Sequence, residues 1–164
     1  MKYFSDNNLL HCSQYGYRCH HSTEHAALEL IDRINNCFIE NGKILGIFLD
    51  LSKAFDTIDY TILLAKLKHY GFRPGALALI ENYLHNRKQF VQIDDVKSGY
   101  LNLETGIPQG SILGPLFIIY MNDLRHASKK SDLINYADDS TFLMDITKFG
   151  KNDHIISTRI DRFL

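Results

Sequence analysis

Apolar positions along this chain follow two spacings, and each spacing predicts a different kind of element. In residues 22–41 apolar side chains recur every three or four positions after a serine-threonine cap, which predicts an amphipathic helix. Residues 43–52 form a nearly continuous apolar run that reaches Asp50, as is typical of a buried strand. Residues 132–144 contain two β-prone runs around adjacent aspartates, which predicts a tight β-hairpin.

The same patterns predict the remaining elements. They are a polar turn at 52–59, helices at 60–71 and 74–86, half-buried strands at 89–93 and 99–103, a glycine-rich loop at 105–115, a helix up to Asn122 and an amphipathic helix at 152–164. Two separate strand regions among several helices indicate an α+β fold. We expect the helices near Leu63 and Phe117 to back the sheet, and the helix near Leu30 and the hairpin at Val91 to pack around it.

Composition limits the chain to one domain. Its 164 residues are 45% hydrophobic, which is enough for one modest core, so a single domain over residues 1–164 is expected. The three cysteines have no paired spacing and follow no signal peptide, which favours a reducing, intracellular setting. The longest apolar run, 113–121, is interrupted by Gly114 and Pro115 and is far shorter than the roughly 20 residues of a membrane span, so no membrane anchor is expected.

The net charge of −1 argues against a basic surface over the whole chain. Basic residues do group at 66–73 and at 87–97, where contact with phosphates and a solvated surface are equally good explanations. A nucleic-acid partner would therefore have to be held locally.

Three carboxylates are the candidate chemistry. Asp138 and Asp139 alone fit an ordinary solvated turn, but Asp50 ends a strand that would lie beside their hairpin. Three acids at one sheet end can hold two hard cations about 4 Å apart, the arrangement used for in-line displacement at phosphorus. The sequence therefore predicts a two-metal phosphoryl-transfer site. Asp56 and Asp59, near a predicted helix start, are interpreted as structural.

Several ordered motifs resemble those of reverse transcriptases. They are FLDLSKAFD at 48–56, GIPQGS at 106–111 and YADD at 136–139, joined by QYGYR at 14–18 and HST at 21–23. The chain is most similar to reverse transcriptases of retrotransposons that lack long terminal repeats, of the jockey-like type. The resemblance covers nearly the whole chain, and it implies a polymerase palm with an antiparallel sheet backed by helices, plus partial fingers.

The resemblance also implies roles for individual residues. Asp50, Asp138 and Asp139 match the family's catalytic, metal-binding carboxylates, which hold two Mg²⁺ ions, with Mn²⁺ as an alternative ion. The nucleotide-binding positions that it implies are Arg18, Leu51, Ser52, Phe55, Gln109 and Gly110. The implied substrates are an RNA template, a DNA primer and deoxynucleoside triphosphates.

Phe55 separates two related classes of polymerase. The resemblance makes it an aromatic gate that leaves no room for a ribose 2′-hydroxyl, so deoxynucleotides would be preferred. Viral RNA-copying RNA polymerases tend to have an aspartate at that position and Gly-Asp-Asp at the hairpin, and this chain has neither. Cys19-His20 departs from the family, whose members often have a basic residue and glycine there, and Tyr136 replaces a common phenylalanine.

Three functions remain open from the sequence. The first is an RNA-directed DNA polymerase palm that is a fragment of a longer protein, with the early fingers, the thumb, an endonuclease and an RNase H segment absent. The second is a catalytically inactive retrotransposon remnant with residual nucleic-acid binding. The third is another two-metal phosphotransferase or nuclease, which would not require Phe55 or the loop that contains Gln109. The sequence does not give the oligomeric state.

Overall fold

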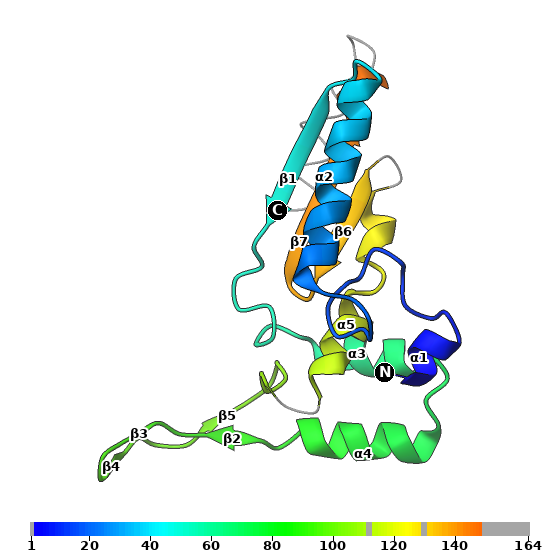
Figure 1. Ribbon diagram of the computed structural model, residues 1–164. Coiled ribbons are helices and arrows are strands. Elements are labelled where there is room, and N and C mark those ends of the chain that lie inside the picture. Colours follow the sequence, from blue (N-terminus) through cyan, green and yellow to red (C-terminus); the bar gives the residue numbers. More distant parts are fainter. Residues whose placement is uncertain (1, 111–112, 129–130, 149–164) are drawn as a thin grey trace.

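The computed structural model describes residues 2–110, 113–128 and 131–148 (Figure 1). Its elements, in chain order, are α1 (Lys2–Asp6), α2 (Thr23–Ile39), β1 (Ile44–Leu49), α3 (Tyr60–His69), α4 (Pro74–Leu84), β2 (Lys88–Gln89), β3 (Gln92–Ile93), β4 (Val96–Lys97), β5 (Leu101–Asn102), α5 (Gly114–Met121), η1 (Leu124–Ala127), β6 (Asp132–Tyr136), β7 (Asp139–Asp145) and η2 (Ile146–Lys148), where η marks a 3-10 helix. The helix predicted at 152–164 lies outside the described residues. The mixture of helices with an antiparallel sheet confirms the α+β class.

The central sheet has three strands in the order β1-β7-β6, and both neighbouring pairs are antiparallel. The predicted hairpin is therefore confirmed as β6 and β7, and the predicted strand before Asp50 pairs with β7. β7 is the central strand because it pairs with β1 on one edge and with β6 on the other. Its neighbouring residues Phe142 and Leu143 point to opposite faces of the sheet, and both are buried.

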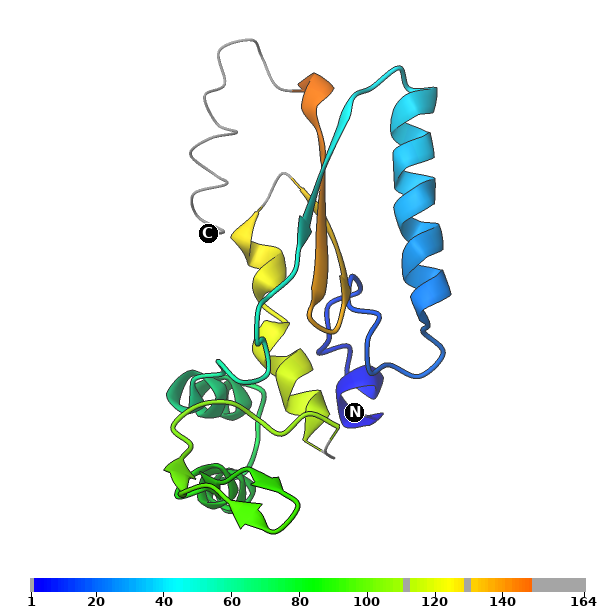
Figure 2. The ribbon, with the colours of Figure 1, turned by 90° about the vertical axis from the view of Figure 1, so that its left-hand side faces the viewer.

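Helix α2 packs on this sheet against β6 (Figure 2). It begins after Ser22, whose hydroxyl accepts a hydrogen bond from the backbone N–H of His25 at 3.3 Å, as the predicted cap requires. Arg33 joins the helix to the strand, since its guanidinium lies 2.7 Å from the carboxylate of Asp132. The helix near Leu30 thus packs on the sheet, as predicted.

Helices α3, α4 and α5 form a second layer around a separate core. Leu63 of α3, Leu84 of α4 and Phe117 of α5 are fully buried in one apolar cluster, which also contains Ala137 from the hairpin bend. The prediction that the helix near Leu63 backs the sheet was wrong, because α3 packs chiefly on α4 and α5. The helix near Phe117 shares its apolar cluster with Ala137, so it reaches the sheet at the hairpin bend. An apolar helix face predicts burial but does not specify the surface that buries it.

The segment 88–102 forms a two-stranded ribbon that projects away from the body (Figure 1). We expected its strands to be half-buried and to pack around the sheet, and this was wrong, because Val91 and all four short strands are exposed. Alternation of apolar and polar residues predicts two unlike faces, but it does not show that either face is covered. Among the described helices, none is both long and apolar enough to cross a bilayer.

Candidate active site at the hairpin bend

The three predicted catalytic aspartates lie at one end of the sheet. Asp50 directly follows β1, Asp139 begins β7, and Asp138 lies in the bend between β6 and β7. The last pair of the β1–β7 ladder is Leu49 with Ser140, so one further step in that register places Asp50 opposite Asp139. Opposed residues of an antiparallel pair point to the same face, so this register favours a shared acidic edge.

The acidic edge has the donor chemistry that a hard divalent cation prefers, since carboxylate oxygens are its usual ligands. Asp50 and Asp139 are exposed and Asp138 is half-buried, so these side chains are reachable from solvent. Within residues 2–110, 113–128 and 131–148, however, no three Asp, Glu, His or Cys side chains lie close enough together to hold a metal ion. The register therefore fits a metal site in part, and the metal-binding role stays a prediction.

The bend itself has a backbone conformation that most residues avoid. Ala137 has a φ of +56°, and a tight two-residue hairpin turn requires a positive φ at this first central position. Such a conformation costs a non-glycine residue on the order of 1–2 kcal/mol. Neighbouring segments must therefore hold the bend in place.

Gln14 holds this bend from the other end of the chain. Its side-chain Oε1 accepts hydrogen bonds from the backbone N–H of Gly16 at 2.8 Å and from that of Ala137 at 3.2 Å. The Gln14 side chain is 2% exposed, so water cannot readily replace either bond. Gln14 is therefore a link between the N-terminal segment and the acidic bend.

Residues 13–16 also extend the sheet edge beside β6. The backbone N–H of Tyr15 donates to the carbonyl of Asn135 at 2.8 Å, and the N–H of Asn135 donates to the carbonyl of Ser13 at 2.8 Å. A Cβ atom on Gly16 would lie only 2.5 Å from the backbone nitrogen of Ala137. Sequence reasoning identified Gln14 and Gly16 only as part of a motif; their roles depend on contacts that no local pattern reveals.

Arg18 is engaged in the same segment. Its Nη1 donates to the backbone carbonyls of His11 and Gln14, each at 3.2 Å, and the side chain is half-buried. In this arrangement the guanidinium braces the loop around residues 11–18. The phosphate contact expected of Arg18 stays a prediction.

The glycine-rich loop docks on the segment that follows Asp50. The N–H groups of Gly106 and Ile107 donate to the carbonyls of Ile58 and Phe55, both at 2.9 Å, and the Tyr60 hydroxyl donates to the carbonyl of Gly106 at 2.9 Å. A Cβ on Gly106 would lie 2.7 Å from the backbone oxygen of Asp56, and its φ is +87°. Only glycine fits there without displacement of the loop.

Phe55 is part of the core in this structure. Its ring is 6% exposed and stacks on the ring of Phe117, with centroids 4.3 Å apart and an interplanar angle of 19°. Stacking of this kind fixes the position of the ring on the helical core. The role of Phe55 as a gate for the incoming sugar stays a prediction.

The other predicted nucleotide-binding residues lie in loops. Leu51 is half-buried and Ser52 is exposed in the turn after Asp50, while Gln109 and Gly110 are exposed at the end of the docked loop. Gly110 has a φ of +67°, which favours glycine. The nucleotide-binding roles that the family resemblance implies for these four residues stay predictions.

The two acids interpreted as structural behave differently. Asp59 caps α3, because its carboxylate accepts a hydrogen bond from the backbone N–H of Ile62 at 3.0 Å, as predicted. Asp56 has an exposed side chain, and its backbone carbonyl accepts from the Thr105 hydroxyl at 2.8 Å. Asp56 thus joins the turn to the glycine-rich loop through its backbone.

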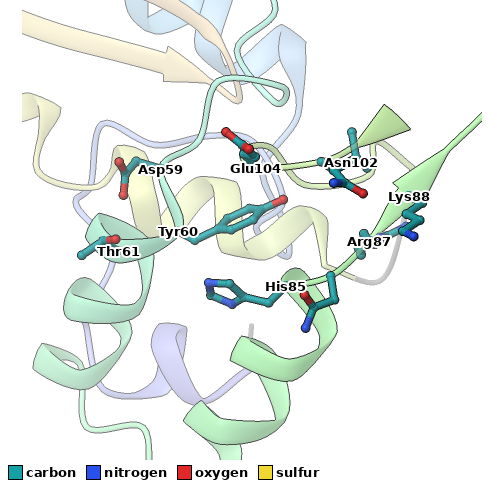
Figure 3. Close-up of a pocket in the computed structure, with 10 residues that line it drawn as sticks. Asp59, Tyr60, Thr61, His85, Arg87, Lys88, Asn102 and Glu104 are labelled. Atoms are coloured by element: carbon teal, nitrogen blue, oxygen red, sulfur yellow. The ribbon is translucent and has the colours of Figure 1, made fainter. Parts of the chain in front are cut away.

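A pocket of about 560 Å³ lies away from the acidic edge, at the base of the ribbon (Figure 3). Tyr60 and His85 lie on facing elements there, and their rings are 5.5 Å apart. Arg87, Lys88 and Asn102 also line it, where the ribbon joins α4 and the loop. The hollow therefore combines acidic, basic and aromatic side chains beside the docked loop.

Comparison with known proteins agrees with the motif order. The family of reverse transcriptases (RNA-dependent DNA polymerases) matches residues 1–156. The RNA-directed DNA polymerase from mobile element jockey of Drosophila melanogaster is 28% identical over 84% of this chain and 17% of its own length. The probable polymerases from transposon BS and transposon X-element of the same species are 29% and 30% identical, over 85% and 77% of this chain.

The chain spans about one sixth of the length of these curated relatives, with 17% of the jockey protein, 16% of the BS protein and 14% of the X-element protein covered. The match nevertheless includes both segments that carry the predicted aspartates and the loop between them. Because the match covers residues 1–156, this chain belongs to the reverse transcriptase (RNA-dependent DNA polymerase) family.

Proposed function

We propose that this chain is the palm, with part of the fingers, of an RNA-directed DNA polymerase. It would add deoxynucleotides to the 3′-hydroxyl of a DNA primer on an RNA template, with pyrophosphate as the leaving group. The observation that carries the proposal is the placement of Asp50, Asp138 and Asp139 at the same end of one sheet, within a chain of this family. The names of the relatives support the same activity.

Asp50, Asp138 and Asp139 would hold two divalent cations. When bound, such ions lower the pKa of the attacking hydroxyl and neutralise charge on the triphosphate. The chain contributes position: the β1–β7 ladder fixes Asp50 relative to Asp139, while Gln14 fixes the bend that carries Asp138. Since none of the three side chains is fully buried, each can reach an ion by a change of rotamer, without movement of the strands.

Phe55 and the glycine-rich loop would select and orient the nucleotide. The backbone bonds from Gly106 and Ile107 hold the loop against the segment that contains Phe55, so Gln109 and Gly110 are presented from a fixed base. Leu51 and Ser52, in the turn after Asp50, would lie near the phosphates. In this proposal the loops recognise the nucleotide, and the three aspartates at the sheet end hold the metal ions for nucleotide addition.

Single-nucleotide addition tests the proposal. A labelled DNA primer annealed to a short RNA template is incubated with the chain and one deoxynucleoside triphosphate, in Mg²⁺ and separately in Mn²⁺. The test variant is Asp138→Asn/Asp139→Asn, and the matched control is Asp94→Asn/Asp95→Asn, which changes another adjacent aspartate pair at another hairpin bend. Poor extension by the wild type and the control, abolished in the test variant, is the expected result, and robust processive synthesis by these 164 residues would contradict it.

A second measurement separates an active palm from an inactive remnant. Mn²⁺ binding, followed by electron paramagnetic resonance, is expected to weaken at least tenfold in Asp138→Asn/Asp139→Asn and to stay unchanged in the control. A wild-type chain that neither extends the primer nor binds Mn²⁺ through these aspartates would contradict the proposal. RNA cleavage without synthesis would instead indicate a two-metal nuclease.

A further inference from the structure

One surface of the projecting ribbon combines aromatic, basic and amide side chains. Lys88 is paired directly with Asn102, and Gln92 is paired with Lys97, so each pair points to a common face. Between the pairs, the rings of Phe90 and Tyr100 meet edge to face with centroids 5.3 Å apart. We call this surface the stacking face; it consists of Lys88, Phe90, Gln92, Lys97, Tyr100 and Asn102.

A one-residue shift in register brings these side chains to the same face. The ladder pairs Gln89 with Leu101 near the base but Ile93 with Val96 near the tip, so the returning strand has one extra residue between. The extra residue is accommodated at Ser98 as a bulge. The N–H of Ser98 donates to the carbonyl of Val91, and its hydroxyl accepts from the N–H of Val91, each at 2.9 Å. Lys97 can then place its ammonium 5.5 Å from the centre of the Phe90 ring.

The stacking face carries two positive charges and no negative one. The nearby acids Asp94 and Asp95 lie at the tip, and Glu104 follows the ribbon at its base. The opposite face is mainly aliphatic, with Ile93 and Val96 69% and 74% exposed, and the pair of Gln89 with Leu101 adds one uncharged amide to it. Charge on one face only, beside two aromatic rings, indicates an occupant that is both anionic and flat-sided.

We propose that the stacking face binds single-stranded RNA. Exposed rings stack on bases whatever the sequence, and lysines neutralise the phosphates beside them. Asn102 supplies an amide, and Gln92, whose Nε2 donates to the carbonyl of Asp94 at 3.0 Å, supplies its amide oxygen. Both can bond to 2′-hydroxyls, which only RNA has. The base of the face adjoins the glycine-rich loop, because Lys88 and Asn102 line a second hollow together with Gly106 and Ile107. The same two residues also line the pocket of Figure 3. The choice of RNA rests on the proposed function, since RNA is the template there.

Binding is measured by fluorescence anisotropy with a labelled oligo(U) strand, in EDTA and without nucleotide. Phe90→Ala/Tyr100→Ala is expected to weaken binding at least tenfold. Lys88→Gln/Lys97→Gln is expected to reduce the slope of log affinity against log salt concentration by about 1.4. Ile93→Ala/Val96→Ala, a matched pair on the opposite face, is expected to bind as the wild type does.

A spectroscopic variant reports contact at the face itself. The chain has no tryptophan, so Phe90→Trp introduces a single indole whose fluorescence a stacked base quenches. Quenching by oligo(U), with wild-type affinity, is the expected result, and circular dichroism checks that every variant is folded. An unquenched indole, or unchanged affinity in Phe90→Ala/Tyr100→Ala, overturns the proposal.

The remaining outcomes are also decisive. Equal binding of the corresponding DNA strand, with the same losses in the variants, overturns the assignment to RNA. Greater loss in Ile93→Ala/Val96→Ala than in the aromatic variant also overturns it, because the opposite face would then bind the RNA. Since binding is measured without metal or nucleotide, its failure is distinct from failure of the polymerase function, which Asp138→Asn/Asp139→Asn reports separately.

Discussion

Replacement of Gly16 by alanine tests whether the N-terminal segment holds the acidic bend. The new methyl group would lie 2.5 Å from the nitrogen and 3.2 Å from the Cα of Ala137. Restoring an ordinary contact of 3.4 Å requires a movement of about 0.9 Å. Neither backbone segment moves easily, because Gln14 accepts hydrogen bonds from both Gly16 and Ala137.

Gly16→Ala is expected to lower the free energy of unfolding by about 1–3 kcal/mol, the usual cost of overpacking. For a chain of this length that corresponds to a fall in melting temperature of about 2–12 °C. In the nucleotide-addition assay the rate is expected to fall on the order of 100-fold, since a displacement near 1 Å disturbs the reacting geometry that much. Thermal unfolding by circular dichroism and the extension assay measure the two effects.

Gly75→Ala is the matched control, because it adds the same methyl group near the start of α4, where nothing lies within 4 Å. Alanine favours a helix over glycine, so its stability is expected to stay the same or to rise slightly. A melting temperature for Gly16→Ala equal to that of the wild type would refute the tight contact. An equal loss in Gly75→Ala would show that the method does not report on this site.

Three further substitutions test separate parts of the structure. Phe55→Ala is expected to cost about 3–5 kcal/mol in urea unfolding, because its buried ring stacks on Phe117. Asp59→Ala is expected to cost about 1 kcal/mol by losing the cap on the Ile62 N–H, whereas Asp59→Asn keeps most of it. Burial, and to a smaller extent neighbouring basic side chains, lower the pKa of His11 from 6.5. Its contribution to stability is therefore present above pH 6.5 and is lost as the pH falls below that value. In His11→Gln the melting temperature is expected to depend less on pH in this range.

The sequence predicted the elements better than their packing partners. The run before Asp50 and the hairpin around Asp138 are determined locally, by apolar runs and a turn, and both formed strands where expected. The expectation that the strand before Asp50 is buried was wrong, because the residues of β1 are half-buried or exposed and Phe48 is 71% exposed. Their convergence followed from one assumption, that the two strand regions share a sheet. The family resemblance supported that assumption through motif order, which spacing alone does not supply.

The ribbon shows why the remainder was not predictable. Its alternation is the same whether a face meets a core, solvent or a ligand, since the pattern describes the strand and not its neighbour. The apolar faces of α3 and α5 have the same ambiguity, and they pack on each other. Long-range contacts of this kind depend on the whole fold.

The acidic bend depends on more than the strands that carry the acids. The β1–β7 ladder fixes Asp139 but leaves Ala137 in an unfavourable conformation at the hairpin end. Gln14 and Gly16 constrain that residue from one side, and its place in the helical cluster constrains it from the other. Since both constraints come from segments without acidic chemistry, loss of either should displace Asp138 while all three aspartates remain. Intact aspartates are therefore necessary for the proposed activity but do not by themselves show that a chain of this family retains it.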